Sequence, residues 1–212
     1  MLRTAVCWML TSSDKRSDGE RRGYLRTPDQ WRPYDPDLFD RLKECTQRDA
    51  NRNVAWVKTA NILPNTVFFE KHLTDSKSER SQYFTEALAS VRSSDLVFFD
   101  PDNGLEIRSR PRGRKDSCKY LYSDELREAY CRGHSILVYQ HFPMKKRDPF
   151  VTELAAQVCE LTSCSRVFSF RTAHVVFLLV PQPRHLHHFE IQARDVASAW
   201  DSQIQFAYHS CS

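Results

Sequence analysis

Short apolar runs rich in β-branched and aromatic residues recur along the chain, and polar segments with helical spacing lie between most of them. Apolar runs of about four to eight residues are typical of buried strands. They predict strands at Thr4–Leu10, Val54–Thr59, Leu96–Asp100, Ser135–Tyr139, Arg166–Phe170 and His174–Val180, with Gln203–Tyr208 closing the chain.

Apolar residues at helical spacing predict the helices between these strands. The helices are expected at Pro36–Gln47, Glu79–Val91, Ser123–Cys131, Phe150–Leu161 and Ile191–Ala199. Strands that alternate with helices favour an α/β fold in three layers around a mostly parallel central sheet. Only Arg171, Thr172 and Ala173 separate the two strands near the C-terminus, so an antiparallel edge hairpin is expected there.

The composition is that of a folded protein without a membrane segment. With 212 residues, no internal repeat and no low-complexity linker, the chain is expected to form a single domain over residues 1–212. No run approaches the roughly 18 apolar residues of a membrane span, and the N-terminus lacks a signal-peptide pattern. We therefore expect a cytoplasmic protein that has no membrane partner. The seven cysteines form no C-x-x-C pair, so they predict buried or incidental thiols and no metal site.

The first candidate site follows the apolar run Leu96–Phe99, where the sequence reads Asp100-Pro101-Asp102-Asn103-Gly104-Leu105-Glu106. Ligands of open α/β sheets bind beyond the carboxyl ends of the strands. Asp100 and Asp102 are candidate catalytic acids or bases, Asn103 offers a donor and acceptors, and Glu106 is a candidate substrate contact. The alternative is a structural Asx turn after the strand.

The second candidate site ends the next apolar strand, with Tyr139, Gln140, His141 and Phe142 before Pro143. Parallel neighbouring strands would place these residues beside the Asp100 loop. His141 is the catalytic candidate because histidine titrates near neutral pH. Tyr139, Gln140 and Phe142 are candidate substrate contacts, and Asn61, after the expected strand Val54–Thr59, is a further one.

Basic residues flank both candidate loops, although the formal net charge of the whole chain is only +4. The clusters suit a phosphate backbone, so a nucleic acid, and DNA in particular, is the expected partner. Arginines and aromatic residues also interleave in Ser12–Tyr34, which suits stacking on bases. The candidate phosphate contacts are Arg112, Arg114, Lys115, Lys119, Lys145, Lys146 and Arg147.

Several cofactor motifs are absent from the sequence. With only five glycines, the chain contains neither G-x-G-x-x-G nor G-x-x-x-x-G-K-[ST], and it lacks a G-x-S-x-G elbow. A site of acids, an amide and a histidine with basic flanks indicates hydrolysis of a nucleic acid without a cofactor.

The Asp100-Pro101 step after Leu-Val-Phe-Phe resembles the first motif of the uracil-DNA glycosylase superfamily. The resemblance implies that Asp100 positions water or stabilises the sugar cation, and that His141 polarises the departing base. It implies a DNA glycosylase that cleaves the N-glycosidic bond of a flipped base. A divergent relative would act on modified bases in defence against phage. The sequence departs from the family because Gln140-His141-Phe142-Pro143 lacks the order histidine-proline-serine-proline.

Three other functions stay open. Asp100-Pro101-Asp102-Asn103 also resembles the Asp-Pro-Pro-aromatic motif of S-adenosylmethionine-dependent methyltransferases, whose late hairpin the strand order matches, although a glycine-rich loop after the first strand is missing. Asp100, Asp102 and Glu106 would suit a metal-dependent nuclease. The last alternative is a nucleic-acid-binding module without catalysis.

Overall fold

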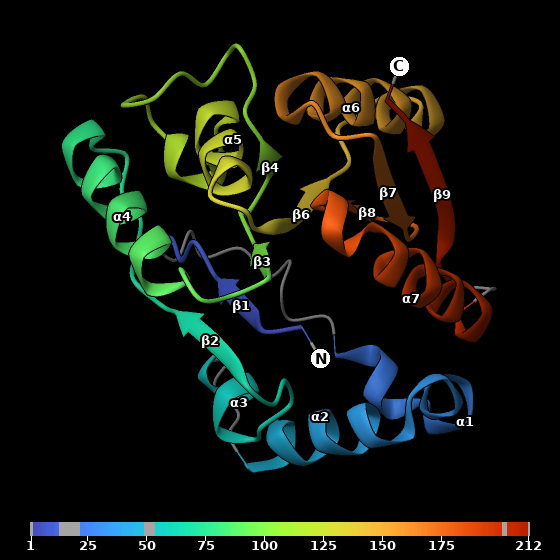
Figure 1. The fold of residues 1–212 in the computed structure, drawn as a ribbon. Helices are drawn as coiled ribbons and strands as arrows, with labels where there is room; N and C mark the ends of the chain where they lie inside the picture. The colour runs from blue at the N-terminus through green and yellow to red at the C-terminus, as the bar shows by residue number, and fades with distance from the viewer. Residues whose placement is uncertain (1, 13–21, 49–53, 201–202, 212) are drawn as a thin grey trace. The chain divides into compact units, whose positions relative to one another are not determined.

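The computed structural model describes residues 2–12, 22–48, 54–200 and 203–211 (Figure 1). The chain divides into two compact units, which we describe separately. Unit 1 comprises Met1–Ser12 and Val67–Ser212, and unit 2 is the segment Ser13–Thr66 between them. The expectation of one domain over residues 1–212 stays a prediction, and part of the arginine-rich and aromatic segment Ser12–Tyr34 lies outside the described residues.

A seven-stranded sheet in the order β2-β1-β3-β6-β8-β7-β9 forms the centre of unit 1. Its strands are β1 Thr4–Cys7, β2 Thr66–Phe69, β3 Leu96–Phe99, β6 Ser135–His141, β7 Arg166–Arg171, β8 Val175–Val180 and β9 Gln205–Ser210. A separate parallel pair joins β4 (Gly104–Leu105) to β5 (Tyr120–Leu121).

The sheet is mixed. β1, β3 and β6 run parallel, whereas β8, β7 and β9 continue the sheet through antiparallel pairs. The expected α/β class is therefore confirmed, and so is the antiparallel β7–β8 pair near the C-terminus. That pair does not form the edge, because β9 adds to β7 on its outer side and β8 lies between β6 and β7.

Four long helices flank the sheet of unit 1: α4 Lys77–Ser90, α5 Ser123–Cys131, α6 Arg147–Thr162 and α7 Leu186–Ala199. Successive side chains of a strand point to opposite faces. Ile136 and Val138 of β6 join the core cluster that contains residues of α4, α5 and α6. Leu137 joins the smaller cluster that contains Phe189 of α7. Short 3₁₀ helices lie at Ser117–Lys119 (η4) and Pro183–His185 (η5).

Unit 2 is helical among its described residues, apart from Thr66 at the start of β2. Its elements are η2 Gly23–Arg26, α1 Pro28–Trp31, η3 Arg32–Tyr34, α2 Pro36–Arg48 and α3 Ala55–Thr59. The strand expected at Val54–Thr59 is wrong, because this segment forms α3. Its apolar run is too short for periodicity to separate a strand from a helix. The segment satisfies its backbone locally, as in the bond from Ala60 N to Trp56 O.

Two cysteines that were expected to be thiols are paired. Cys159 at the end of α6 and Cys211 after β9 form a disulfide across a sequence separation of 52. The antiparallel pairing of β9 with β7 brings them together, and spacing along the chain gave no sign of it. Among the described residues, no helix is both long enough and apolar enough to cross a membrane.

Candidate active site

The carboxyl ends of β1, β2 and β3 meet at one edge of the sheet of unit 1. β1 pairs in parallel with β3, and past its end Leu10 forms a parallel bridge with His72. The chain passes from β1 to β2 on one side of β1, and then to β3 and β6 on the other side. The strand order therefore reverses between β1 and β3, and such a switch point is where open α/β sheets bind ligands.

The Asp100 loop lies at this switch point. The amide of Asp100 donates to the carbonyl of Cys7, with an N–O distance of 3.1 Å. The hydroxyl of Thr11 donates to Oδ2 of Asp102 at 2.7 Å. Asp100 is half-buried and Asp102 is exposed. The two carboxylates therefore follow β3 directly, beside the loop that leaves β1.

The side chain of Gln140, in β6, connects this strand to the Asp100 loop by hydrogen bonds. Its Nε2 donates to the carbonyl of Asn103 at 3.0 Å, and its Oε1 accepts from the amide of Leu105 at 2.8 Å. The amide of His141 also donates to the carbonyl of Asn103, at 3.2 Å. The Gln140 side chain is buried and its polar atoms contact backbone groups, so it positions the loop. Its expected contact with substrate stays a prediction.

The remaining candidates at the end of β6 differ in exposure. His141 is exposed, whereas Tyr139 is half-buried with its ring 5.8 Å from that of Phe177, centroid to centroid. Phe142 packs against Phe150 at 6.1 Å. His141 thus lies at a strand end next to the Asp100 loop, as the parallel order predicted, while the rings of Tyr139 and Phe142 contact other aromatic side chains.

Two other candidate substrate contacts, Glu106 and Asn61, form hydrogen bonds outside the Asp100 loop. Oε1 of Glu106 accepts a hydrogen bond from the amide of Ser123 at 2.8 Å, at the first residue of α5. Asn61 belongs to unit 2, where its backbone has a φ of 50° and its carbonyl accepts from Arg41 at 3.0 Å. The structure gives Glu106 a role at the start of a helix, and it places Asn61 in a turn after α3.

Two residues that we did not predict lie at the ends of β1 and β2. Oε1 of Glu70 and Nε1 of Trp8 are buried and have no hydrogen-bond partner in the structure. Trp8 also stacks on Phe68, with ring centroids 6.4 Å apart. The sequence held a signal for Glu70, because Val67-Phe68-Phe69-Glu70 repeats the pattern Val97-Phe98-Phe99-Asp100. A buried acceptor and a buried donor without partners are what a polar ligand would satisfy.

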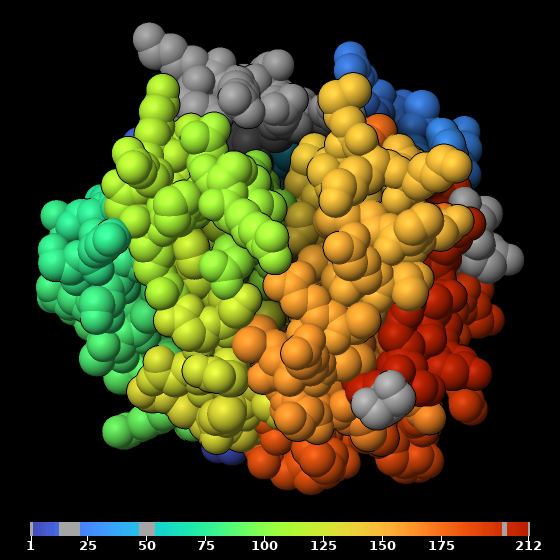
Figure 2. Space-filling model, turned by 90° about the horizontal axis from the view of Figure 1, so that it is seen from above, coloured from blue at the N-terminus to red at the C-terminus, as the bar shows by residue number. Residues whose placement is uncertain are grey.

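The two basic segments lie on one face of unit 1. Figure 2 shows the green segment that contains residues 108–119 and the amber segment that contains residues 145–147 on this face. Arg114, Lys115, Lys145, Lys146 and Arg147 are exposed, and Lys119 is half-buried. Arg112 is instead bound by Asp124 and Glu125, with its guanidinium 4.3 Å from the centroid of the Tyr122 ring.

Buried polar groups fasten the first basic segment to α4. The guanidinium of Arg80 donates to both carboxylate oxygens of Glu125, at 2.6 and 2.7 Å, and to the carbonyl of Tyr120 at 2.6 Å. Asp75, which precedes α4, accepts hydrogen bonds from the amides of Asp116 and Cys118 and from the hydroxyl of Ser117. Burial acts to raise the pKa of Asp75, but these hydrogen bonds outweigh it and lower the pKa.

A cavity of about 580 Å³ lies away from the switch point, between α6, β7 and β9. Ser169 and His209 contribute to its wall, with Oγ and Nε2 3.0 Å apart. Ser169 is 2% exposed, so its hydroxyl is not an accessible nucleophile. We assign the candidate site to the switch point, because the carboxylates and the unpartnered groups lie there.

Within the described part of the chain, the side chains close enough to share a metal ion are Cys159, Cys164 and Cys211, and Asp100, Asp102 and Glu106 are not such a group. Comparison of the chain with protein-family models, with curated proteins and with solved structures finds no match.

Proposed function

We propose that unit 1 is a nucleic-acid-modifying enzyme that binds a nucleoside-containing ligand at the switch point between β1 and β3, and that its reaction is methyl transfer from S-adenosylmethionine. The observation that carries this proposal is the buried carboxylate oxygen of Glu70, which lacks a hydrogen-bond partner at the end of β2. In nucleotide-binding α/β folds an acid after a strand next to the phosphate loop accepts the ribose hydroxyls.

The residues around the switch point suit the nucleoside part of such a ligand. Glu70 would accept from the ribose, and Nε1 of Trp8 would donate to it or to the base. The missing glycine-rich loop argues against the cofactor. However, Met9 has a φ of 48° in the segment after β1, so the backbone there adopts the left-handed conformation that glycine usually provides.

The sheet order also favours this reaction. The resemblance of Asp100-Pro101-Asp102-Asn103 to a methyltransferase motif implies a β-hairpin late in the chain. The β7–β8 hairpin, with β8 antiparallel to β6, agrees with that expectation. A three-layer arrangement with a mostly parallel core belongs to the same proposal.

In this proposal S-adenosylmethionine supplies an electrophilic methyl group when bound. The carboxylate of Asp100 and the side-chain oxygen of Asn103 would accept hydrogen bonds from an amino group of the target base and orient it, and Asp100 would accept the proton that the amino group loses. The exposed basic residues of segments 108–119 and 145–147 would hold the phosphates of the nucleic acid, which makes binding dependent on salt.

N-glycosidic cleavage is the second candidate, favoured by the parallel register of β3 and β6, which puts the ends that bear Asp100 and His141 side by side. Asp100 would stabilise positive charge on the sugar, and His141 would donate to the departing base. Such an enzyme would remove modified bases from phage DNA in the cytoplasm.

One assay separates the two reactions. Purified chain is incubated with unmodified DNA or heavily modified phage DNA, with and without methyl-labelled S-adenosylmethionine. We expect label in the nucleic acid and no free base, with loss of label in Asp100→Asn. Free base released without the cofactor would establish the glycosylase instead, and neither product from either DNA would overturn both reactions.

Ligand binding provides an independent test. We expect S-adenosylmethionine to bind the wild-type chain in calorimetry and to bind Glu70→Gln at least about tenfold more weakly, since a ribose hydrogen bond to a charged group is lost. Glu153→Gln, at an exposed position of α6, is the matched control. Equal affinity for the three proteins would exclude Glu70 from the site.

A further inference from the structure

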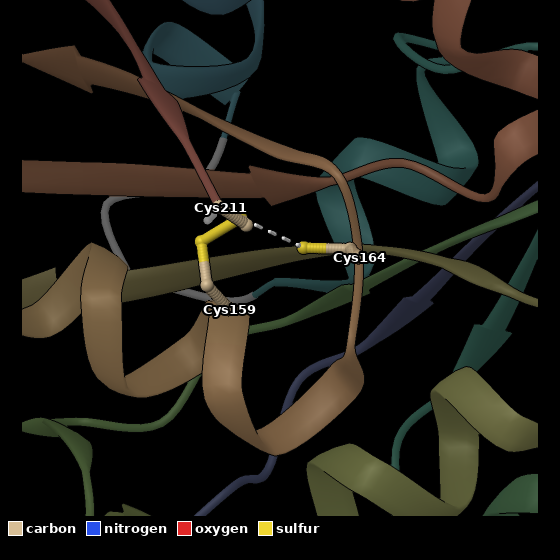
Figure 3. Close-up of side chains that lie close together, drawn as sticks. All are labelled: Cys159, Cys164 and Cys211. Carbon is tan, nitrogen blue, oxygen red and sulfur yellow. Dashed lines mark hydrogen bonds between the residues drawn. A yellow bond between two sulfur atoms is a disulfide. The ribbon is translucent and has the colours of Figure 1, made fainter.

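Cys159 and Cys164, which are five residues apart, meet the distant Cys211 where α6 ends, β7 begins and β9 ends. Cys159 and Cys211 form the disulfide, and Sγ of Cys164 lies 3.6 Å from Sγ of Cys211. The three sulfur positions all lie within 4.8 Å of one another. Figure 3 shows the Cys164 side chain pointing at the disulfide from the connection between α6 and β7. A free thiol therefore contacts a disulfide in the folded protein.

Backbone hydrogen bonds hold Cys159, Cys164 and Cys211 close together independently of the disulfide. The amide of Cys211 donates to the carbonyl of Ser165 at 3.1 Å, which continues the pairing of β9 with β7. Ser163, with a φ of 52°, ends α6 in the left-handed conformation, and its amide donates to the carbonyl of Cys159 at 2.8 Å. This turn returns the chain so that Cys164 lies near the last turn of the helix.

We propose that Cys159, Cys164 and Cys211 form one exchangeable disulfide site, in which Cys211 bonds alternately to Cys159 and to Cys164. The Cys164 thiol loses its proton to solvent, and the thiolate attacks Sγ of Cys211. The bond between Cys211 and Cys159 breaks, and Cys159 leaves as a thiolate that takes up a proton. One disulfide and one thiol are present before and after the step, so no oxidant or reductant is consumed.

Access favours Cys211 as the sulfur that meets external reagents. Cys159 and Cys164 are buried, at 8% and 5% exposure, whereas Cys211 is half-buried. Attack on a disulfide depends on which sulfur is accessible. A small thiol would therefore attack Sγ of Cys211 and form a mixed disulfide, releasing the bonded cysteine as a thiol, and either buried cysteine would resolve it by releasing the small thiol. In the reduced chain, the Cys211 thiol would form the same mixed disulfide with a small disulfide, releasing one small thiol. The site thus takes low-molecular-weight thiols and disulfides as its ligands, and it keeps the edge strand β9 tethered in both bonded states.

Disulfide mapping tests the exchange in the full chain. Protein is incubated without reductant, quenched with acid, alkylated and cleaved after glutamate. Cleavage after Glu160 separates Cys159 from Cys164, so mass spectrometry distinguishes the two linked peptides. We expect both the 159–211 and 164–211 links in the wild-type chain. Cys164→Ser should contain only the first link, and Cys131→Ser, at an exposed free cysteine, should match the wild type.

A variant without Cys159 provides the decisive test, because only the link between Cys164 and Cys211 can then form at this site. In Cys159→Ser, oxidised glutathione should oxidise Cys164 and Cys211 to a disulfide in two exchange steps that release two glutathione molecules. Alkylation of the folded wild-type chain at Cys159 should require Cys164, because Cys159 becomes a thiol only after the exchange.

Two results would overturn the proposal. The first is a wild-type chain that contains only the 159–211 link at every pH, together with a folded Cys159→Ser chain in which Cys164 and Cys211 stay alkylatable. The second is stoichiometric binding of Cd²⁺ by the reduced chain, lost in each of the three serine variants, while the oxidised chain shows no exchange. That outcome would assign a thiolate metal site instead.

Discussion

The hydroxyl of Thr11 donates a hydrogen bond of 2.7 Å to Oδ2 of Asp102, and it joins the loop after β1 to the loop after β3. These two loops flank the position where the strand order of the sheet reverses. The bond therefore fixes the geometry of the candidate site before any ligand enters, and such preorganisation strengthens binding.

Thr11→Val should loosen this site without unfolding the protein. Valine keeps the shape of the side chain and removes the donor, while the exposed Asp102 keeps its contact with water. We expect a loss of about 0.5–1.5 kcal/mol in the free energy of unfolding. Amide hydrogen exchange should become faster in residues 100–104. Thr85→Val, which removes a bond to Ser81 on α4, is the control, and equal exchange in both variants would contradict the assignment.

Gly104→Ala should be strongly destabilising. Gly104 has a φ of 114°, and a Cβ there would overlap the side-chain amide of Gln140. We expect a loss of about 2–4 kcal/mol from backbone strain and overpacking, measured by urea unfolding. The double variant with Gln140→Ala should lose less than the sum of the single variants, because the smaller side chain removes the overlap. Gly23→Ala has open space around the new Cβ and is the control.

Arg80→Ala should cost about 3–5 kcal/mol, because it leaves the buried carboxylate of Glu125 without its partner. Both side chains are almost fully buried, at 2% and 7% exposure for the residues. Chemical denaturation measures the change. Lys71→Ala breaks the exposed pair with Glu86 and should cost less than about 1 kcal/mol. Similar losses in both variants would show that burial of the Arg80 pair is not decisive.

The stability should depend on pH through His209. Burial lowers the pKa of His209 in the folded protein below the ordinary value of 6.5. Between the two pKa values the unfolded chain binds more protons than the folded chain, so the free energy of unfolding decreases as the pH falls through this window. The stabilisation from the neutral imidazole is complete above the unfolded pKa. Urea denaturation at pH values from about 5 to about 8, a range that spans the ordinary histidine pKa, measures the free energy of unfolding. Its dependence on pH should be weaker in His209→Gln than in the wild-type chain.

Reduction of the disulfide should destabilise unit 1. A link across a separation of 52 residues restricts the unfolded chain, by about 4 kcal/mol in the loop-entropy account. Unfolding with and without a phosphine reductant measures the loss. Under oxidising conditions Cys159→Ser should keep most of this stability through the link from Cys164 to Cys211, whereas Cys211→Ser should lose it. Equal stability of the two variants would contradict the exchange.

Local patterns predicted most of the elements of unit 1. Ser123–Cys131 was predicted with its exact bounds, because its Ser-Asp-Glu start and its end before Gly133 are local signals. β2 was not expected, although Val67-Phe68-Phe69-Glu70 repeats the pattern of β3 and Asp100. Val54–Thr59 failed because a short apolar run fits either a strand or a helix.

The sequence by itself determined the α/β class, the acids that follow β3 and the histidine that ends β6, because strand length, burial and turn chemistry are properties of neighbouring residues. The tertiary structure alone decided that Gln140 and Glu106 contact backbone groups and that Glu70 and Trp8 hold unpartnered polar atoms. It also decided that Cys211 meets the neighbouring pair Cys159 and Cys164. Most of these relationships depend on the order and register of strands that are far apart in the sequence, as in the pairing of Thr4 with Leu96, and no local pattern encodes which strands pair.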